Sequence, residues 1–133
     1  MSAEALKTET RDGVRLLTLN RPDVRNAIHP ALAEALIEAF IDADHDPAVS
    51  CVAITGAGSA FSSGADLRDA RDRSEGAKPY RGPLHSARRS IFEALIDTRK
   101  PTLAIVNGAA IAGTTRFTSP QRSISATAMR RPV

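Results

Sequence analysis

The sequence predicts a single α/β domain. A chain of 133 residues is long enough for one modest domain and too short for two. Strand-like and helix-like segments alternate along it, which is typical of strands joined by helical crossovers. Glycine-rich loops follow two of the strand-like segments. The composition, 42% hydrophobic and 25% charged, agrees with a soluble globular protein.

The first predicted elements form a β-hairpin followed by a helix. Residues 14–19 alternate partly in polarity, and the turn signal Asp12-Gly13 separates them from a plausible partner strand at 6–10. A helix is expected from Pro30, since proline suits a first helical position. The apolar face of this helix is expected to consist of Leu32, Leu36, Ala39, Phe40 and Ala43.

The second half of the chain repeats the alternation. A strand is expected at 49–55, and residues 66–74 are a candidate short helix. A longer helix is expected from Pro83 to about Lys100, where Pro101 ends it. Its apolar stripe is expected to consist of Leu84, Ala87, Ile91, Phe92 and Leu95. A buried strand at 102–106 then leads into the loop at 107–113.

Residues 114–133 differ in kind from residues 1–113. They are rich in serine and threonine and have neither a helical nor a strand period, so we expect them to be disordered. The basic charge is concentrated there, because four arginines fall in this tail with no acidic residue. The other 14 of the 18 basic residues nearly balance the 15 acidic ones. The tail has only Phe117 for base stacking and no nucleic-acid motif, which makes nucleic-acid binding a weaker hypothesis.

The sequence favours the cytoplasm. Cys51 is the one cysteine, which excludes an internal disulfide and suits a reducing compartment. The N-terminus has neither the basic start nor the apolar core of a secretory signal. No apolar run approaches the length of a membrane span, so no membrane partner is expected.

The loop at 54–67 carries three glycines, Gly56, Gly58 and Gly64. Glycine serves where the backbone takes positive φ or comes into contact with a ligand. A dinucleotide fingerprint fails because Phe61 stands at its last glycine position, and the Gly-Lys-Ser/Thr of a phosphate-binding loop is absent.

Two junctions between a strand and a glycine loop remain, at 63–67 and at 107–113. Each could direct a backbone N–H into a shared space, and two such donors on one oxygen form an oxyanion hole. The alternative is that both are tight turns without a function. Their spacing alone leaves both interpretations open.

Several motifs in register resemble the crotonase superfamily of enoyl-CoA hydratases and isomerases. They cover nearly all of residues 4–113 in the order and at the spacing that the family shows. The motifs are Leu-Asn-Arg-Pro at 19–22, Arg-Asn-Ala at 25–27, Ile-Thr-Gly-Ala-Gly at 54–58, Ala-Phe at 60–61, Ser-Gly-Ala-Asp-Leu at 63–67, Lys-Pro-Thr at 100–102 and Val-Asn-Gly-Ala-Ala-Ile-Ala-Gly at 106–113.

The resemblance implies the N-terminal part of a crotonase-type ββα spiral and an acyl-CoA or enoyl-CoA thioester as substrate, with no separate cofactor. It implies an oxyanion hole made by the N–H groups of Ala65 and Gly113. It also implies that Arg25 and Ala27 line the coenzyme A site. The residues along the acyl and pantetheine path would be Ser63, Gly64, Ala65, Asp66, Leu67 and Arg68. Members of the family assemble as homotrimers or hexamers.

The chain departs from the family pattern after Gly113. Hydratases of the family use two glutamates as acid and base; Arg116 stands at the first position, and the second would lie beyond Val133. The departure resembles a reading-frame change. We therefore expect the chain to bind acyl-CoA but to be catalytically impaired. The alternatives are a non-catalytic fragment that associates with full-length subunits and a nucleic-acid binder acting through the tail.

The other candidates favour structural roles. His29, His45 and His85 lack the spacing of metal ligands, and no metal is expected. The carboxylates of Asp42, Asp44 and Asp46 are interpreted as a solvated helix end, and Arg88-Arg89 as a solvated helix face. Cys51 is expected to be a buried, inert thiol. Ser62 and Ser63 have no evident base, which disfavours nucleophilic catalysis. Asp66 could contact a ligand or bond to local backbone N–H groups.

Overall fold

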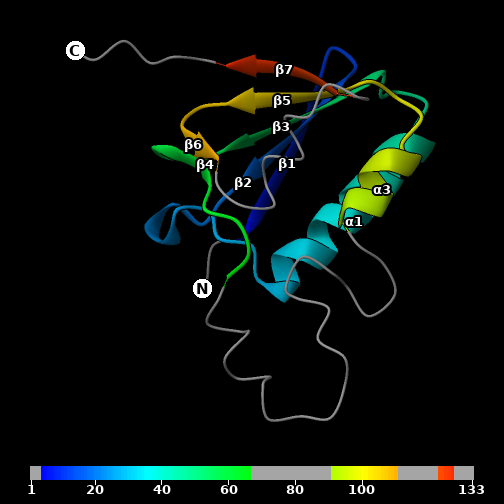
Figure 1. Cartoon of the computed structure of the whole chain (residues 1–133). Coiled ribbons are helices and arrows are strands. Elements are labelled where there is room, and N and C mark those ends of the chain that lie inside the picture. The colour runs from blue at the N-terminus through cyan, green and yellow to red at the C-terminus, as the bar shows by residue number, and fades with distance from the viewer. Residues whose placement is uncertain (1–3, 67–90, 111–122, 128–133) are drawn as a thin grey trace, which may run out of the picture.

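The computed structural model describes residues 4–66, 91–110 and 123–127 and confirms an α/β fold (Figure 1). The strands are β1 Leu6–Arg11, β2 Val14–Leu19, β3 Cys51–Gly56, β4 Ala60–Ser62, β5 Thr102–Val106, β6 Ala109–Ala110 and β7 Ser123–Thr127. The helical elements are the 3-10 turn η1 Pro22–Val24 and the α-helices α1 Pro30–His45 and α3 Ile91–Asp97.

The main sheet has the strand order β1-β2-β3-β5-β7. β1 and β2 are antiparallel, and the other neighbouring pairs are parallel. Asp12 and Gly13 turn the hairpin with φ of 51° and 82°. Positive φ at both central residues matches the right-handed twist of the flanking strands. The hairpin predicted from the Asp-Gly signal is therefore confirmed.

Helix α1 connects β2 to β3 and packs on one face of the sheet (Figure 1). Pro30 occupies its first turn, and the N-cap His29 accepts a hydrogen bond from the Leu32 N–H through Nδ1 at 3.4 Å. The apolar face predicted for this helix is buried except for Ala39, which is half-buried against the core. The buried residues of α1 are Leu32, Ala33, Leu36, Ile37, Phe40 and Ala43.

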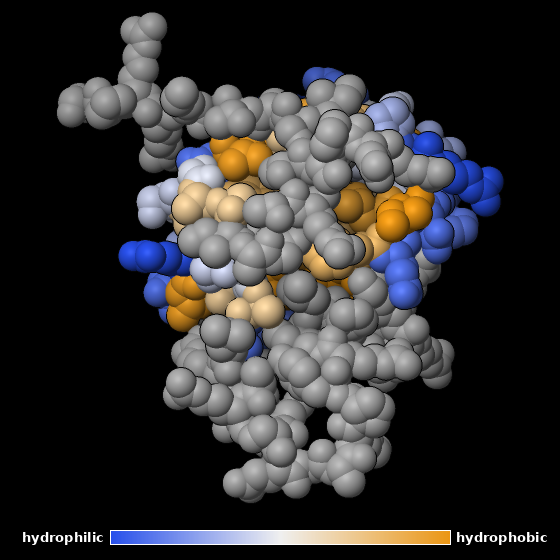
Figure 2. Space-filling view, in the orientation of Figure 1, coloured by the Kyte–Doolittle hydropathy of each residue, from blue (hydrophilic) through white to orange (hydrophobic). Residues whose placement is uncertain are grey.

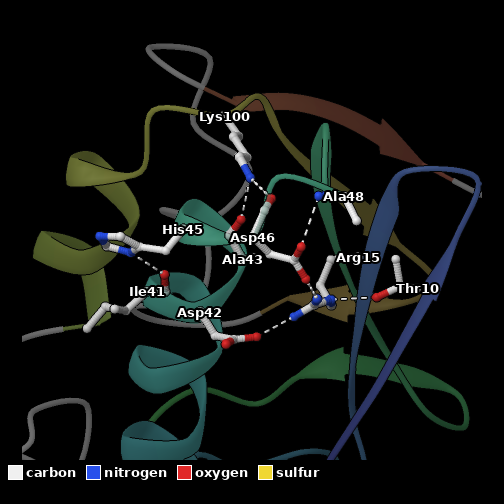
Figure 3. Close-up of polar contacts among 9 residues, drawn as sticks. All are labelled: Thr10, Arg15, Ile41, Asp42, Ala43, His45, Asp46, Ala48 and Lys100. Carbon is white, nitrogen blue, oxygen red and sulfur yellow. Dashed lines mark hydrogen bonds and ion pairs between the residues drawn. The ribbon is translucent and has the colours of Figure 1, made fainter.

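Two side chains, one from β2 and one from the loop that precedes β5, hold the C-terminal end of α1 (Figure 3). Arg15 on β2 is paired with Asp42 at 2.7 Å and with Asp46 at 2.8 Å. Lys100 donates from Nζ to the carbonyl oxygens of Ala43 and Asp46. The Ala43 oxygen also accepts the Asp46 N–H at 3.4 Å and the Asp46 oxygen accepts the Val49 N–H at 3.1 Å, so the ammonium is an additional donor to both. Its positive charge at this end also interacts favourably with the helix dipole. Asp42 is solvated as expected, with its side chain 72% exposed, but the sequence did not indicate that Asp42 and Asp46 both pair with Arg15.

Helix α3 lies beside α1 on the same face of the sheet and precedes β5 (Figure 1). Its residues Ile91 and Ala94 join the core, whereas Phe92 and Leu95 pack against it half-buried. The stripe predicted for the second helix is confirmed over these residues. Its earlier part, at 83–90, and the candidate short helix at 66–74 beyond Asp66 lie outside the described residues.

A second sheet, which the sequence did not reveal, pairs β4 with β6 in parallel. Ala60 is the partner of Ala109, and Ser62 of Ala110. Strands this short have no readable polarity period. They join the segment after β3 to the segment after β5, so the two junctions identified in the sequence lie at neighbouring places.

Strand β7 differs from the expectation for residues 114–133. Residues 123–127 pair in parallel with β5, from Thr102 beside Ser123 to Val106 beside Thr127. Main-chain hydrogen bonds hold such a strand, and they require no apolar face. The absence of an apolar period therefore did not exclude a strand at this edge. The rest of 114–133 lies outside the described residues.

The surface on the helix side is mixed. Hydrophilic residues occupy its outer edge, and hydrophobic residues show next to them (Figure 2). Ile41 on α1 is 42% exposed and Ile96 on α3 is 55% exposed. All the described helices are too short or too polar to traverse a lipid bilayer.

Candidate functional site

The site is built on the loop that leaves β3. Gly58 and Gly64 have φ of 80° and 90°, a region that other residues avoid. Gly56 serves a different purpose. A Cβ atom there would lie 2.4 Å from the carbonyl oxygen of Phe61 and 2.5 Å from that of Ala60. The three glycines of the loop thus allow two turns and one close backbone crossing.

The side-chain amides of two asparagines hydrogen-bond to the backbone of this loop. Asn26, fully buried, donates from Nδ2 to the carbonyl oxygens of Ala57 and Ala60 at 2.9 Å each. Asn107 donates from Nδ2 to the carbonyl oxygens of Gly58 at 3.1 Å and Ala60 at 3.2 Å. The sequence showed both only as motif residues. An asparagine within a turn segment was the available signal, since its amide can bond to nearby backbone.

The segment 25–28 runs beside the segment 62–66. The carbonyl oxygen of Arg25 accepts the Ser63 N–H at 2.9 Å. Arg25 is exposed and takes φ 54°, whereas Ala27 is 7% exposed. The structure therefore brings the two residues expected at the coenzyme A site next to those expected along the acyl path. Leu67, Arg68 and Gly113 lie outside the described residues.

Ala65 forms an isolated parallel bridge with Ile28. The Ile28 N–H donates to the carbonyl oxygen of Gly64, and the Asp66 N–H donates to that of Ile28, both at 2.8 Å. In a parallel bridge of this kind the central residue turns its own N–H and C=O away from the partner. The Ala65 N–H accordingly points away from Ile28. Within residues 4–66, 91–110 and 123–127 no acceptor bonds to it.

Asp66 is held by a cation. Its Oδ2 lies 3.3 Å from Nη1 of Arg21, and the two side chains are 8% and 18% exposed. The same Nη1 donates to the carbonyl oxygen of Ala27 at 2.5 Å. The sequence did not indicate this ion pair with Arg21. It ties the carboxylate to the backbone of the segment that carries Arg25 and Ala27.

The remaining candidates that the structure describes are not gathered as a metal site. In the described part of the chain, no three histidine, cysteine or acidic side chains gather as metal ligands would. His45 is exposed and bonds through Nδ1 to the carbonyl oxygen of Ile41 at 2.8 Å. His85 and Arg88-Arg89 fall outside the described residues. Cys51 is half-buried, which corrects the expectation of a buried thiol, because its strand leaves that side chain partly open.

Comparison with known proteins decides the family. The chain matches the family model described as enoyl-CoA hydratase/isomerase over residues 9–119. The chain belongs to this family. The assignment made from motifs to the crotonase superfamily is therefore confirmed.

Relatives in the enoyl-CoA hydratase/isomerase family agree in sequence and in fold. The chain is 36% identical over 112 residues to enoyl-CoA hydratase EchA19 of Mycobacterium tuberculosis, covering 82% of this chain and 41% of that protein. It is 34% identical over 107 residues to hydroxycinnamoyl-CoA hydratase-lyase of Pseudomonas fluorescens, covering 79% and 39%. The crystal structure of an enoyl-CoA hydratase from Mycobacterium marinum matches with a TM-score of 0.69 and 37% identity, covering 79% and 49%.

The chain thus spans about two fifths of the length of the curated relatives it matches. The fold expected from the resemblance, the N-terminal part of a crotonase-type domain, is confirmed by the structural match. The family match ends at residue 119 and includes both strand-to-glycine junctions.

Proposed function

We propose that this chain binds an acyl-CoA thioester and that the Ala65 N–H donates a hydrogen bond to the thioester carbonyl oxygen. The observation that carries the proposal is the orientation of this N–H, which the bridge turns away from Ile28 and leaves without an acceptor in the described residues. The Gly113 N–H is the second donor of the proposed oxyanion hole.

The proposed hole acts on charge that develops during reaction. Attack at the β-carbon of an enoyl thioester, or removal of an α-proton, pushes negative charge onto the thioester oxygen. A fixed N–H stabilises that enolate without changing its own protonation state. The neighbouring segment supplies the coenzyme A contacts: Arg25 offers an exposed guanidinium for a phosphate, and Ala27 offers a small apolar surface. Hydration and isomerisation both use this stabilisation.

Catalysis by the 133-residue chain is proposed to be weak. Arg116 stands where the resemblance places a glutamate, and a guanidinium cannot act as a general base. Loss of one acid or base group commonly lowers a rate about 10²–10⁴-fold. Hydration of crotonyl-CoA by the purified chain at a rate comparable to a full-length family hydratase would contradict this part of the proposal.

Binding is tested by calorimetric titration with crotonyl-CoA and, as the matched ligand, free coenzyme A. The variant replaces the Ala65 residue by lactic acid, which converts the Gly64–Ala65 amide into an ester. This change deletes the Ala65 N–H donor and weakens the Gly64 carbonyl oxygen as the acceptor of the Ile28 N–H. A hydrogen bond is worth about 0.5–1.5 kcal/mol net. We expect crotonyl-CoA affinity to fall roughly 2–10-fold while free coenzyme A affinity stays unchanged. Equal affinity of the variant for crotonyl-CoA would overturn the assignment of Ala65.

A further inference from the structure

A buried hydroxyl lies three residues before the proposed donor, Ala65. Ser62 on β4 is 0% exposed. Its Oγ donates to the carbonyl oxygen of Asn26 at 2.7 Å and accepts the N–H of Gly64 at 3.1 Å. A buried hydroxyl with both bonds made is a directional link between the groups it joins. Here the link runs from the 25–28 segment to the residue that precedes Ala65.

Gly64 is held at both of its main-chain groups. Its N–H is bonded to Ser62, and its carbonyl oxygen accepts the Ile28 N–H at 2.8 Å. The peptide between Gly64 and Ala65 is planar and trans, so its N–H points opposite to its C=O. Gly64 has φ 90° and no side chain to restrict it. The Ile28 bond holds the peptide plane between Gly64 and Ala65, and the Ser62 bond holds the preceding plane, between Ser63 and Gly64. Together the two bonds restrict the rotation about the Gly64 Cα that sets the direction of the Ala65 N–H.

The acceptor of the Ser62 hydroxyl is itself rigid. Asn26 takes φ 56°, a left-handed conformation in which its peptide needs support. Its side chain accepts the Arg21 N–H through Oδ1 at 2.8 Å and is 0% exposed together with its backbone. The Ser62 hydroxyl therefore connects the fixed carbonyl of Asn26 to the N–H of Gly64, a residue with no side chain to restrict its backbone.

We infer that Ser62 is a positioning residue, whose hydroxyl sets the direction of the Ala65 N–H through Gly64. The inference rests on the proposed function for its consequence in binding, because the Ala65 N–H matters only if a thioester oxygen meets it. The orientation itself is a property of the free chain. It can be measured without any ligand.

The first experiment measures the direction of one bond vector. Residual dipolar couplings of the ¹⁵N–¹H pairs are recorded on the weakly aligned, ligand-free chain, and the amides of α1 and β3 define the alignment. We expect Ser62→Ala to change the coupling of Ala65 beyond experimental error. Thr98→Val is the matched control. It deletes a buried hydroxyl that bonds to the Ala94 carbonyl oxygen at 2.9 Å on the other side of the fold, and it is expected to leave that coupling unchanged.

The second experiment measures the hydrogen bond to the ligand. The isotope-edited infrared stretch of a [1-¹³C]crotonyl-CoA carbonyl moves to lower wavenumber when the oxygen accepts a hydrogen bond. We expect a smaller downshift with Ser62→Ala than with the wild-type chain, and an unchanged downshift with Thr98→Val. The affinity of Ser62→Ala for crotonyl-CoA is expected to be roughly 2–10-fold lower than that of the wild-type chain, and its affinity for free coenzyme A is expected to be unchanged.

The outcomes separate the two proposals. An Ala65 coupling in Ser62→Ala that matches the wild type overturns the positioning role, whatever the ligand data show. A changed coupling with no carbonyl downshift in the wild type supports the positioning role and sinks the proposed function. Ser62→Cys retains a weaker donor and acceptor. Because that variant keeps part of the link, its Ala65 coupling is expected to lie between those of the wild type and a variant without the hydroxyl. If Ser62→Ala does not fold, Ser62→Gly removes the hydroxyl instead, and an Ala65 coupling equal to wild type would then overturn the role.

Discussion

Ile28 and Ala65 lie side by side in a parallel bridge, yet neither main-chain group of Ala65 bonds to Ile28. The bonds are made by Gly64 and Asp66, one residue to either side, at 2.8 Å each. The pairing that holds the backbone in place therefore leaves the Ala65 N–H, between the two bonded residues, without a partner in the bridge. An amide fixed in this way needs no reorganisation when an oxygen with developing charge meets it.

Asn26 is predicted to be a major stabilising side chain of the site. Asn26→Ala leaves the Arg21 N–H and the carbonyl oxygens of Ala57 and Ala60 without this partner, and it puts alanine at φ 56°. We expect a loss of about 2–4 kcal/mol in the free energy of unfolding, measured in urea. Asn26→Gly loses the same bonds without the strain. It should be about 1 kcal/mol more stable than Asn26→Ala.

Gly108 is predicted to tolerate no side chain. A Cβ atom there would lie 1.9 Å from the carbonyl oxygen of Ser59, a backbone atom that cannot move aside alone. We expect Gly108→Ala to disrupt the pairing of β4 with β6 and to lower stability by more than about 3 kcal/mol. Gly58→Ala is the comparison, because its Cβ would meet Pro22 at 3.0 Å and its cost comes mainly from φ 80°. In thermal unfolding, the melting temperature of Gly108→Ala should lie well below that of Gly58→Ala. Equal melting temperatures would contradict the close approach of Gly108 to the Ser59 carbonyl oxygen.

Arg15 is predicted to contribute more than its exposed partner. Its side chain is 10% exposed and bonds to Thr10, Asp42 and Asp46. Arg15→Met retains the apolar stem but leaves these groups unpaired, so we expect a loss of about 1–3 kcal/mol. Asp42 is 72% exposed. Asp42→Asn should therefore cost about 0.5 kcal/mol or less in the same urea titration. A larger effect at Asp42 than at Arg15 would show that burial does not determine the strength of this cluster.

The pair Arg21–Asp66 is predicted to behave non-additively. Arg21→Met leaves a carboxylate that is only 8% exposed without its cation, which we expect to cost about 3 kcal/mol. Adding Asp66→Asn removes the buried charge that has lost the Arg21 guanidinium. The double variant should recover at least about 1 kcal/mol of the free energy of unfolding relative to Arg21→Met. Strictly additive losses in this double-mutant cycle would indicate that the two side chains do not interact.

Local signals were sufficient for the elements that carry strong patterns. The Asp12-Gly13 turn predicted the hairpin, and the spacing of Leu32, Leu36 and Phe40 predicted the buried face of α1. The resemblance of the motif at 63–67 to the crotonase superfamily implied Ala65 as a donor. In each case the information lies within a few residues, because turns and amphipathic faces are determined by neighbours along the chain.

Interactions between distant segments were not predictable in the same way. The Asn26 amide reaches residues more than 30 positions away, and Arg15 and Lys100 meet at one helix end from different strands and loops. Strands β4, β6 and β7 depend on main-chain pairing rather than on an apolar period. No pattern in the residues themselves marks which backbone atom they will contact.

The sequence by itself determined the α/β class, the family and the loop on which the proposed donor sits, because these follow from local periodicity and from motifs in register. The tertiary structure decided the direction of the Ala65 N–H, the pairing of Asp66 with Arg21 and the link from Asn26 through Ser62 to Gly64. A hydrogen bond has a direction as well as a donor, and that direction exists only once the segments 25–28 and 62–66 lie side by side.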